Sequence, residues 1–258
     1  MIHLPLVEIW NKKSLIFHFA LLNIKIRFKS TKLGFVWAAI EPLLYFIVLY
    51  VVFTNIRDKT DDFAIYLITG IMIYHIFARG TTGGLASLTT NHGIIKSLNI
   101  KKEFFPIVST VAIGILAFVD IGVFLGLMPV FQFIPSWTLI LLPIPLILLI
   151  ILILGFSYLL SLINVFVRDI QQLWSVFIHV LLFVSPIFWS ISEVGGILQD
   201  IQKINPLGQL IEISHKLVID GEIPPLNDWL YTTSFVLVIF FIGYFVFQKY
   251  ESKVVEEL

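Results

Sequence analysis

The chain has 258 residues, of which 58% are hydrophobic and only 13% are charged, and its mean hydropathy is +0.96. This composition excludes an ordinary water-soluble domain, in which about 45–50% of residues are apolar. Lysine plus arginine and aspartate plus glutamate each number 17, and cysteine is absent, so the chain offers neither a strong net charge for nucleic acid nor a thiol for disulfides, metals or catalysis.

The first predicted element is an amphipathic helix at 14–32. Its apolar stripe consists of residues at helical spacing, which are Phe17, Leu21, Ile24 and Phe28. Basic side chains lie about a quarter-turn from this stripe. We expect the helix to lie in the cytoplasmic interface of a bilayer, with its bases near anionic head groups.

Six hydrophobic runs follow, each long enough to cross about 30 Å of hydrocarbon, which takes roughly 20 helical residues. Because lipid cannot hydrogen-bond a backbone, each run is predicted to be helical. We predict an all-α integral membrane fold, a single transmembrane domain over residues 1–258, with spans at 33–56, 63–83, 106–131, 136–164, 171–191 and 228–249.

The loop between the second and third runs mixes apolar and basic side chains, namely Ile94, Ile95 and Leu98 with Lys96, Lys101 and Lys102. A short amphipathic helix here would offer a compact knob to a cytoplasmic partner. A loop bound to lipid head groups accounts for the composition equally well.

The segment 192–227, between the fifth and sixth runs, is too apolar for a plain loop and too interrupted to span. Prolines at 206 and at 224–225 interrupt it, because proline removes a backbone donor and breaks helices. We therefore predict one or two re-entrant or interfacial helices on the outer side.

Lysine and arginine are distributed unevenly between the two sides of the predicted bundle. All of them fall on the side that carries both termini except Arg57, Lys59, Lys203 and Lys216. The positive-inside rule therefore predicts a multi-pass protein of the cytoplasmic membrane with both termini in the cytoplasm.

No motif for catalysis or nucleotide binding is present. The nearest glycine cluster, at 80–84, lacks the lysine of a P-loop. The six histidines show no metal-ligand spacing. We therefore expect no catalytic residue, no metal and no bound cofactor in this chain.

Polar side chains inside the runs are functional candidates, because hydrocarbon makes them costly. Glu41 and Asp120 lie deepest, so each must face the protein interior, form a pair or be protonated. A structural ion pair or an interhelical hydrogen bond explains either residue at least as well as a role in transport. His75 and His179 are expected to be interior hydrogen-bonding groups, and snorkelling to head groups explains Arg79, Arg168 and Asp169.

Aromatic residues make up 15% of the chain, including 24 phenylalanines. Most aromatic side chains of membrane helices only face lipid, pack against other helices or lie at the membrane–water interface. An aromatic surface with polar neighbours would also suit a sugar, whose ring has apolar faces and hydroxyl edges.

Taken in order, the segments resemble the transmembrane permease subunit of type-2 ABC exporters, in the branch that exports O-antigen, teichoic acid and related cell-surface glycans. The resemblance covers nearly the whole chain. It rests on RFKSTKLGFVWAAIEPL at 27–43, YLITGIMIYHIF at 66–77, HGIIKSLNIKKEFFP at 92–106, NVFVRDI at 164–170, SPIFW at 185–189 and Asn-Pro at 205–206.

The resemblance implies a homodimer of permeases with two copies of an ATP-binding subunit, which would bind ATP and Mg. It implies that 14–32 is the interface helix, that roughly 91–104 is the coupling helix seated in the ATPase, and that 192–227 forms outer gate helices. The substrate would be a polysaccharide, expected to be lipid-linked, and membrane lipids would be further partners. Spans one and five would line the pathway, with glycan contacts expected at Trp37, Tyr45, Phe183, Phe188 and Trp189.

Three other functions remain open. An exporter of the same architecture could move a drug or a lipid. An ion-coupled carrier could be built around Glu41 and Asp120. An intramembrane enzyme could use His75, His179 or Asp169, although no catalytic spacing supports one.

Overall fold

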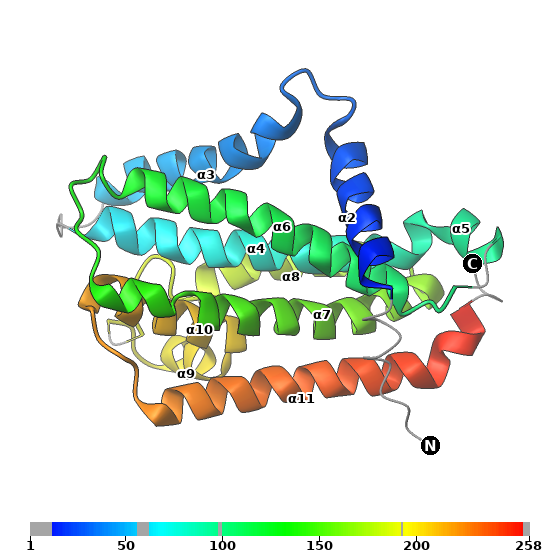
Figure 1. Cartoon of the computed structure of the whole chain (residues 1–258). Coiled ribbons are helices and arrows are strands. Elements are labelled where there is room, and N and C mark those ends of the chain that lie inside the picture. The colour runs from blue at the N-terminus through cyan, green and yellow to red at the C-terminus, as the bar shows by residue number, and fades with distance from the viewer. Residues whose placement is uncertain (1–11, 56–61, 98–99, 192, 255–258) are drawn as a thin grey trace.

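The computed structural model describes residues 12–55, 62–97, 100–191 and 193–254. Within these ranges every regular element is a helix, and the long helices run side by side in one elongated bundle (Figure 1). The all-helical membrane architecture predicted from the hydrophobic runs is therefore confirmed.

Five helices in the described ranges are long and apolar enough to cross a membrane. Each coincides with one of the predicted runs, since a backbone in lipid must satisfy its hydrogen bonds within the helix. They are α3 (Trp37–Thr54), α4 (Phe63–Thr90), α6 (Phe104–Leu127), α7 (Pro143–Phe166) and α11 (Leu226–Tyr250). Short 3-10 turns precede α3 at Gly34–Val36 and α7 at Trp137–Leu141.

The fifth predicted span, 171–191, is helical only over α8 (Ile170–Val184). At about 1.5 Å per residue, its 15 residues reach roughly 22 Å, short of the hydrocarbon thickness. The helix stops because Ser185 is extended, with φ −85° and ψ 154°, as the residue before a proline prefers. The structure thus has five helices of spanning length in its described part where the sequence predicts six.

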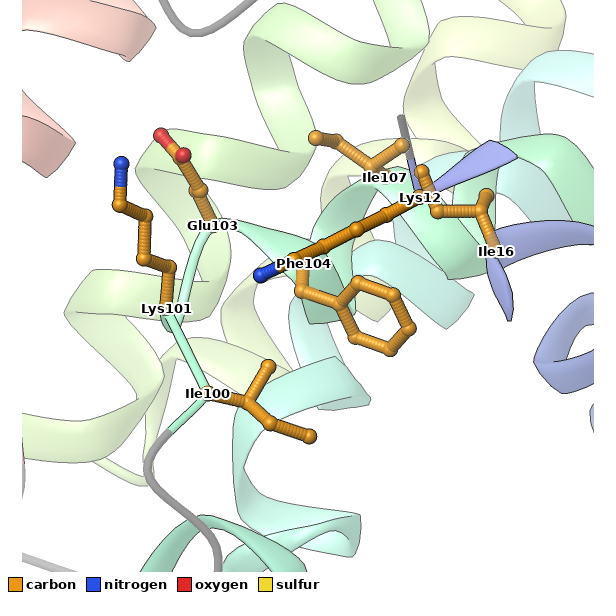
Figure 2. Close-up of a pocket in the computed structure, with 7 residues that line it drawn as sticks. All are labelled: Lys12, Ile16, Ile100, Lys101, Glu103, Phe104 and Ile107. Carbon is orange, nitrogen blue, oxygen red and sulfur yellow. The ribbon is translucent and has the colours of Figure 1, made fainter. Parts of the chain in front are cut away.

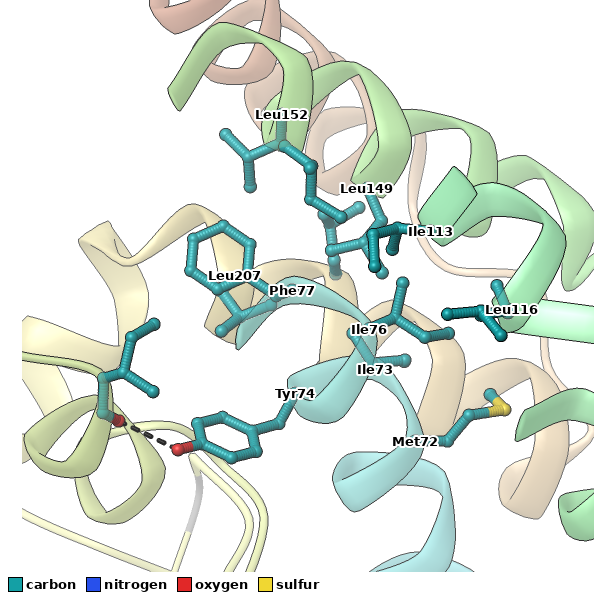
Figure 3. Packing of buried hydrophobic residues seen from close by; sticks show 14 of the residues in the cluster. Met72, Ile73, Tyr74, Ile76, Phe77, Ile113, Leu116, Leu149, Leu152 and Leu207 are labelled. Carbon is teal, nitrogen blue, oxygen red and sulfur yellow. Dashed lines mark hydrogen bonds between the residues drawn. The ribbon is translucent and has the colours of Figure 1, made fainter. Parts of the chain in front are cut away.

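Helix α4 forms the centre of the bundle, and 89% of its apolar stretch is buried inside the protein. Figure 3 shows Ile76 of α4 beside Ile113 and Leu116 of α6, with Leu149 and Leu152 of α7 on the next side. By contrast, only 17% of the apolar stretch that contains α3 is buried, and only 22% of the one that contains α11. These two outer helices therefore leave most of their apolar surface to lipid or to another protein.

Small residues set how closely α7 approaches its two main neighbours. A Cβ at Gly84 of α4 would lie 1.9 Å from the Ser157 hydroxyl, and one at Gly243 of α11 would lie 2.3 Å from the Gly155 carbonyl oxygen. The absent side chains let the backbones meet, as small residues do at membrane helix interfaces. Helix α4 runs seven residues past its predicted end at 83 because its glycines serve packing and do not end the helix.

The interface helix predicted at 14–32 overlaps α2 (Lys13–Phe28). Helix α2 runs across the long helices and packs on α6 (Figure 1). The stripe against the protein is Ile16, Ala20 and Ile24, whereas Phe17 and Leu21 stay exposed. The predicted stripe is thus divided, with Ile24 facing the protein and two apolar side chains facing outward.

Between α8 and α11 the chain forms α9 (Ile197–Ile204) and α10 (Pro206–His215), which continues as a π-helical turn over Lys216–Asp220. The break falls at Asn205, as predicted. Its side chain accepts a hydrogen bond from the Leu207 amide at 3.1 Å and caps α10. Helix α10 packs against α4, α7 and α11.

Candidate functional site

A buried ion pair joins α4 to α6. The Arg79 guanidinium donates to the Asp120 carboxylate, and the two residues are only 9% and 1% exposed. Asp120 is therefore paired in the protein interior, as one of its two interpretations predicted. The snorkelling interpretation of Arg79 was wrong, because an inward partner satisfies its charge.

Beside this pair lies a polar cleft of about 450 Å³. Its walls come from four helices and carry charged and aromatic side chains, which include Arg27 of α2, Glu41 and Tyr45 of α3, His75 and Arg79 of α4, and His179 of α8. The Tyr74 hydroxyl, drawn in Figure 3, donates to the Ile178 carbonyl at 3.0 Å and ties α4 to α8. Glu41 thus faces a cleft between helices, which explains how its charge is accommodated in an apolar run.

The two histidines of this cleft differ in environment. His75 is 5% exposed and its ring lies edge-on to Tyr45, with the centroids 5.1 Å apart. His179 is exposed and its Nδ1 lies 2.6 Å from the Ser175 carbonyl of its own helix. The predicted interior position is therefore correct for His75, although its Nδ1 has no hydrogen-bond partner among the described residues, and it is wrong for His179.

The five aromatic candidates fall into separate places. Trp37 and Tyr45 are exposed on α3, and Phe183 is 54% exposed on α8. Phe188 has no exposed surface, because it stacks on Phe53 with centroids 4.3 Å apart. Trp189 and Phe183 flank that ring. The structure thus brings Phe183, Phe188 and Trp189 together and places Tyr45 in the cleft.

Helices α3 and α8 both present exposed apolar side chains and both contribute to the cleft. On α8 these side chains are Leu173, Val176, Phe177, Val180 and Phe183, and on α3 they include Leu44, Ile47, Val48, Val51 and Val52. Surfaces of this kind suit lipid or a second membrane protein.

The predicted coupling segment 91–104 contains one short helix, α5 (His92–Ser97). Within it Ile95 is buried, Ile94 is half-buried and Lys96 is exposed, so the helix presents a basic surface. After α5, Lys101 is exposed and Lys102 is half-buried. Leu98 lies outside the described residues.

The end of α11 and the 3-10 turn that follows it, Glu251–Lys253, hold the chain between α5 and α6. The Lys102 amide donates to the Glu251 carboxylate at 2.9 Å, and the Gln248 side chain donates to Glu103. Figure 2 shows the neighbouring corner, where Ile16 of α2 lies by Phe104 of α6. The basic surface of α5 is therefore connected to the bundle through both α6 and α11.

At the other end of the bundle, α10 is fixed to the start of α4. The His215 ring stacks on Tyr66 with centroids 3.8 Å apart, and its Nε2 donates to the Tyr66 carbonyl at 3.0 Å. Burial lowers the pKa of His215 to about 3, so the ring is neutral at physiological pH. Burial also raises the pKa of Glu212, and the charge of Lys216 opposes this.

Sequence reasoning missed two contributors to these sites. Arg27 was not among the predicted site residues, yet it lines the cleft. Its position three residues after Ile24 could have placed it at the edge of the buried stripe. The Tyr66–His215 contact joins residues that are 149 positions apart in sequence, so no local sequence pattern predicts it.

The long apolar helices define a multi-pass membrane protein, and no group of His, Asp or Glu in the described ranges is arranged to hold a metal. Residues 16–218 match the family of ABC-2 type transporters. The chain therefore belongs to the ABC-2 type transporter family.

Named relatives cover nearly the full length. The O-antigen export system permease protein RfbA of Klebsiella pneumoniae is 28% identical over 242 residues, 92% of each chain. A protein of the same name from Myxococcus xanthus is 20% identical over 259 residues, which cover 97% of this chain and 98% of the relative. The polysialic acid transport protein KpsM of Escherichia coli is 24% identical over 243 residues, 89% and 91% of the two chains.

Proposed function

We propose that the chain is the permease subunit of an ATP-driven exporter that moves a cell-surface polysaccharide, carried on a lipid, across the cytoplasmic membrane. The observation that carries this proposal is the end-to-end similarity to relatives named for O-antigen export and polysialic acid transport. The family match supports the transport class. The pairing of Asp120 with Arg79 gives that carboxylate a structural partner, which supports a structural role over an ion-coupled carrier.

The energy would come from a separate ATP-binding subunit that holds ATP and Mg, with two copies in the complex. Helix α5 is our candidate for the contact, because its exposed Lys96 and the nearby Lys101 form a basic knob. Its attachments to α6 and α11 support the idea that force applied there reaches the bundle.

Two copies of the permease would enclose the pathway, with α3 and α8 of each facing the partner copy. Their exposed apolar faces and the cleft between them support this arrangement.

In the complete topology α8 together with residues 185–191 would make the sixth crossing. Helices α9 and α10 would form the re-entrant outer gate, and both termini would lie in the cytoplasm. The two permeases would then rock as rigid bodies.

Transport in proteoliposomes tests the proposal. Vesicles containing this chain and its ATP-binding subunit should move a lipid-linked glycan when ATP is supplied, and neither protein should do so alone.

The double variant Tyr45→Ala, Phe183→Ala should slow export while leaving assembly intact, because both rings are exposed on the proposed pathway helices. Phe118→Ala, which removes a ring 74% exposed on α6, is the matched control. Glycan transport without ATP, or by this chain alone, would contradict the proposal.

A further inference from the structure

A second cleft, of about 520 Å³, lies between α2, α4 and α6. It adjoins the cleft described above, and the two share Arg27, Gly83 and Ala86. Its lining residues come from α2 and from the C-terminal part of α4, and α2 crosses the long helices at the end of the bundle where α5 is attached (Figure 1). By the distribution of basic residues, this is the cytoplasmic end.

The α6 wall of the cleft changes from polar to apolar with depth. Ser109, Ala112, Ile113 and Leu116 line it and follow one helical stripe. Leu116 lies about 10 Å further along the axis than Ser109, since each helical residue rises about 1.5 Å. The α6 wall therefore offers a hydroxyl at its cytoplasmic end and branched apolar side chains further along the helix.

The α4 wall has the same gradient. Thr90 and Ser87 line the end near α5, and the small residues Ala86 and Gly83 follow deeper. Ser87 is 4% exposed, and its hydroxyl has no hydrogen-bond partner among the described residues. A Cβ at Gly83 would lie 3.1 Å from the Ser109 hydroxyl, so these two residues are level, and Ile113 and Leu116 of α6 line the part of the cleft beyond them.

The α2 wall supplies the charge. Arg27 is the one ionisable side chain among the described residues that line this cleft, and Asn23 stands one helical turn before it. A guanidinium offers several donors in a planar fork that suits phosphate. A basic pocket between membrane helices on the cytoplasmic side is the arrangement that binds anionic lipid head groups.

We propose that this cleft binds a glycerophospholipid of the cytoplasmic leaflet, with its phosphate at Arg27 and Asn23 and one acyl chain along Ile113 and Leu116. Along the cleft, from Thr90 and Ser87 through Ser109 to Ile113 and Leu116, the lining changes from polar to apolar, as a phospholipid does. None of the described lining residues is aromatic, whereas Tyr45, Tyr74 and His75 line the neighbouring cleft. The absence of a stacking ring favours a phospholipid over a sugar-bearing lipid here.

Native mass spectrometry of the full chain in detergent tests this proposal independently of transport. After delipidation and incubation with phosphatidylglycerol, the wild type should retain one lipid per chain. Arg27→Gln should reduce retention about tenfold, which corresponds to about 1.4 kcal/mol, because the neutral amide loses the charge-assisted hydrogen bond to the phosphate. Ala86→Phe should reduce it by filling the cleft.

Lys25→Gln is the matched control, because Lys25 is an exposed base on the same helix that lines neither cleft. Its retention should equal that of the wild type. Equal losses in Lys25→Gln and Arg27→Gln would mean diffuse attraction to the surface and would overturn the proposal. So would unchanged retention in Arg27→Gln, or recovery of a glycan-bearing lipid in place of phospholipid from the protein purified without delipidation.

Discussion

The buried ion pair between Arg79 and Asp120 gives the sharpest prediction for a single residue. Asp120→Asn keeps the shape of the side chain but leaves the guanidinium buried without its counter-charge. Removing one partner of a buried pair costs about 3–5 kcal/mol. We therefore expect a clear fall in the thermal stability of the detergent-solubilised protein, measured by unfolding scans.

The control for this variant is a second ion pair of the same chain. Lys216 and Asp228 are joined at 2.9 Å, with side chains 30% and 35% exposed. Because solvent screens such pairs, Asp228→Asn should cost about 1 kcal/mol or less. Equal losses in the two aspartate variants would show that burial does not set the contribution of the Arg79–Asp120 pair.

Acid should destabilise the protein through His215. The folded-state pKa of about 3 lies below the ordinary value, near 6.5, so the unfolded chain binds a proton more readily. Stability from this group is full above about pH 6.5 and falls by roughly 1.4 kcal/mol per unit as the pH drops toward 3. We expect the melting temperature to decline between pH 6.5 and 4.5.

His215→Gln should flatten that decline, because glutamine retains a donor for the Tyr66 carbonyl without titrating. Glu212, whose pKa burial raises, titrates in the opposite sense in both proteins. The comparison between the two pH profiles therefore isolates the histidine. Parallel profiles would show that another group causes the acid sensitivity.

For single residues, the sequence identified candidate side chains but not the residues that they contact. Hydropathy alone marks Asp120 as a carboxylate that needs a partner. Its pairing with Arg79 depends on the rotation of α4 against α6, and the two residues stand 41 positions apart. For Phe188 the sequence could not distinguish two environments. An aromatic residue near a proline gives the same local pattern whether its ring lines a passage or is buried against Phe53.

Among the elements, the α7–α11 contact depends on glycine. In Gly243→Ala the new Cβ would meet the Gly155 backbone oxygen, so α11 must move away from α7. Overpacking of this kind costs about 1–3 kcal/mol, which a thermal unfolding scan would detect. Gly122→Ala is the control, because no atom lies within 4 Å of a Cβ there. Equal stability of both variants would contradict the packing role of Gly243.

The surface of α5 can be tested without unfolding the helix. Lys96 is exposed, so Lys96→Glu should leave the fold intact while it reverses the charge of the proposed ATPase contact. We expect at least a tenfold loss of the ATP-binding subunit in co-purification, because a like-charge contact at an interface costs several kcal/mol. Lys29→Glu, at an exposed position just after α2, should retain the partner. Ile95 is unsuitable for this test because it is buried.

Long apolar helices were predictable because lipid leaves the backbone few alternatives. The predicted bounds of α6, α7 and α11 lie within several residues of the observed ones. The end of α8 was missed because Ile187 and Phe188 are fully buried although they lie outside any helix. Hydropathy reports burial, and it does not distinguish a buried helix from a buried irregular segment.

For the whole molecule, the absence of cysteine allows the orientation to be measured by single-cysteine labelling. Gly195→Cys, placed before α9 where a Cβ meets no atom within 4 Å, should react with a membrane-impermeant maleimide in intact cells. Ser97→Cys, exposed at the end of α5, should react only after permeabilisation. The opposite pattern would invert the orientation inferred from the basic residues.

The attachment of α11 to the loop after α5 has a mechanical consequence. Glu251 and Gln248 hold that loop from one side, while α6 continues from it directly. A load applied at α5 therefore reaches α4, which ends two residues before it, and also α6 and α11, which lie on different sides of α7 (Figure 1). With α4 and α7 packed against them, these helices would shift as one lever, and α3, largely outside that group, would be the part of the bundle left free to hinge.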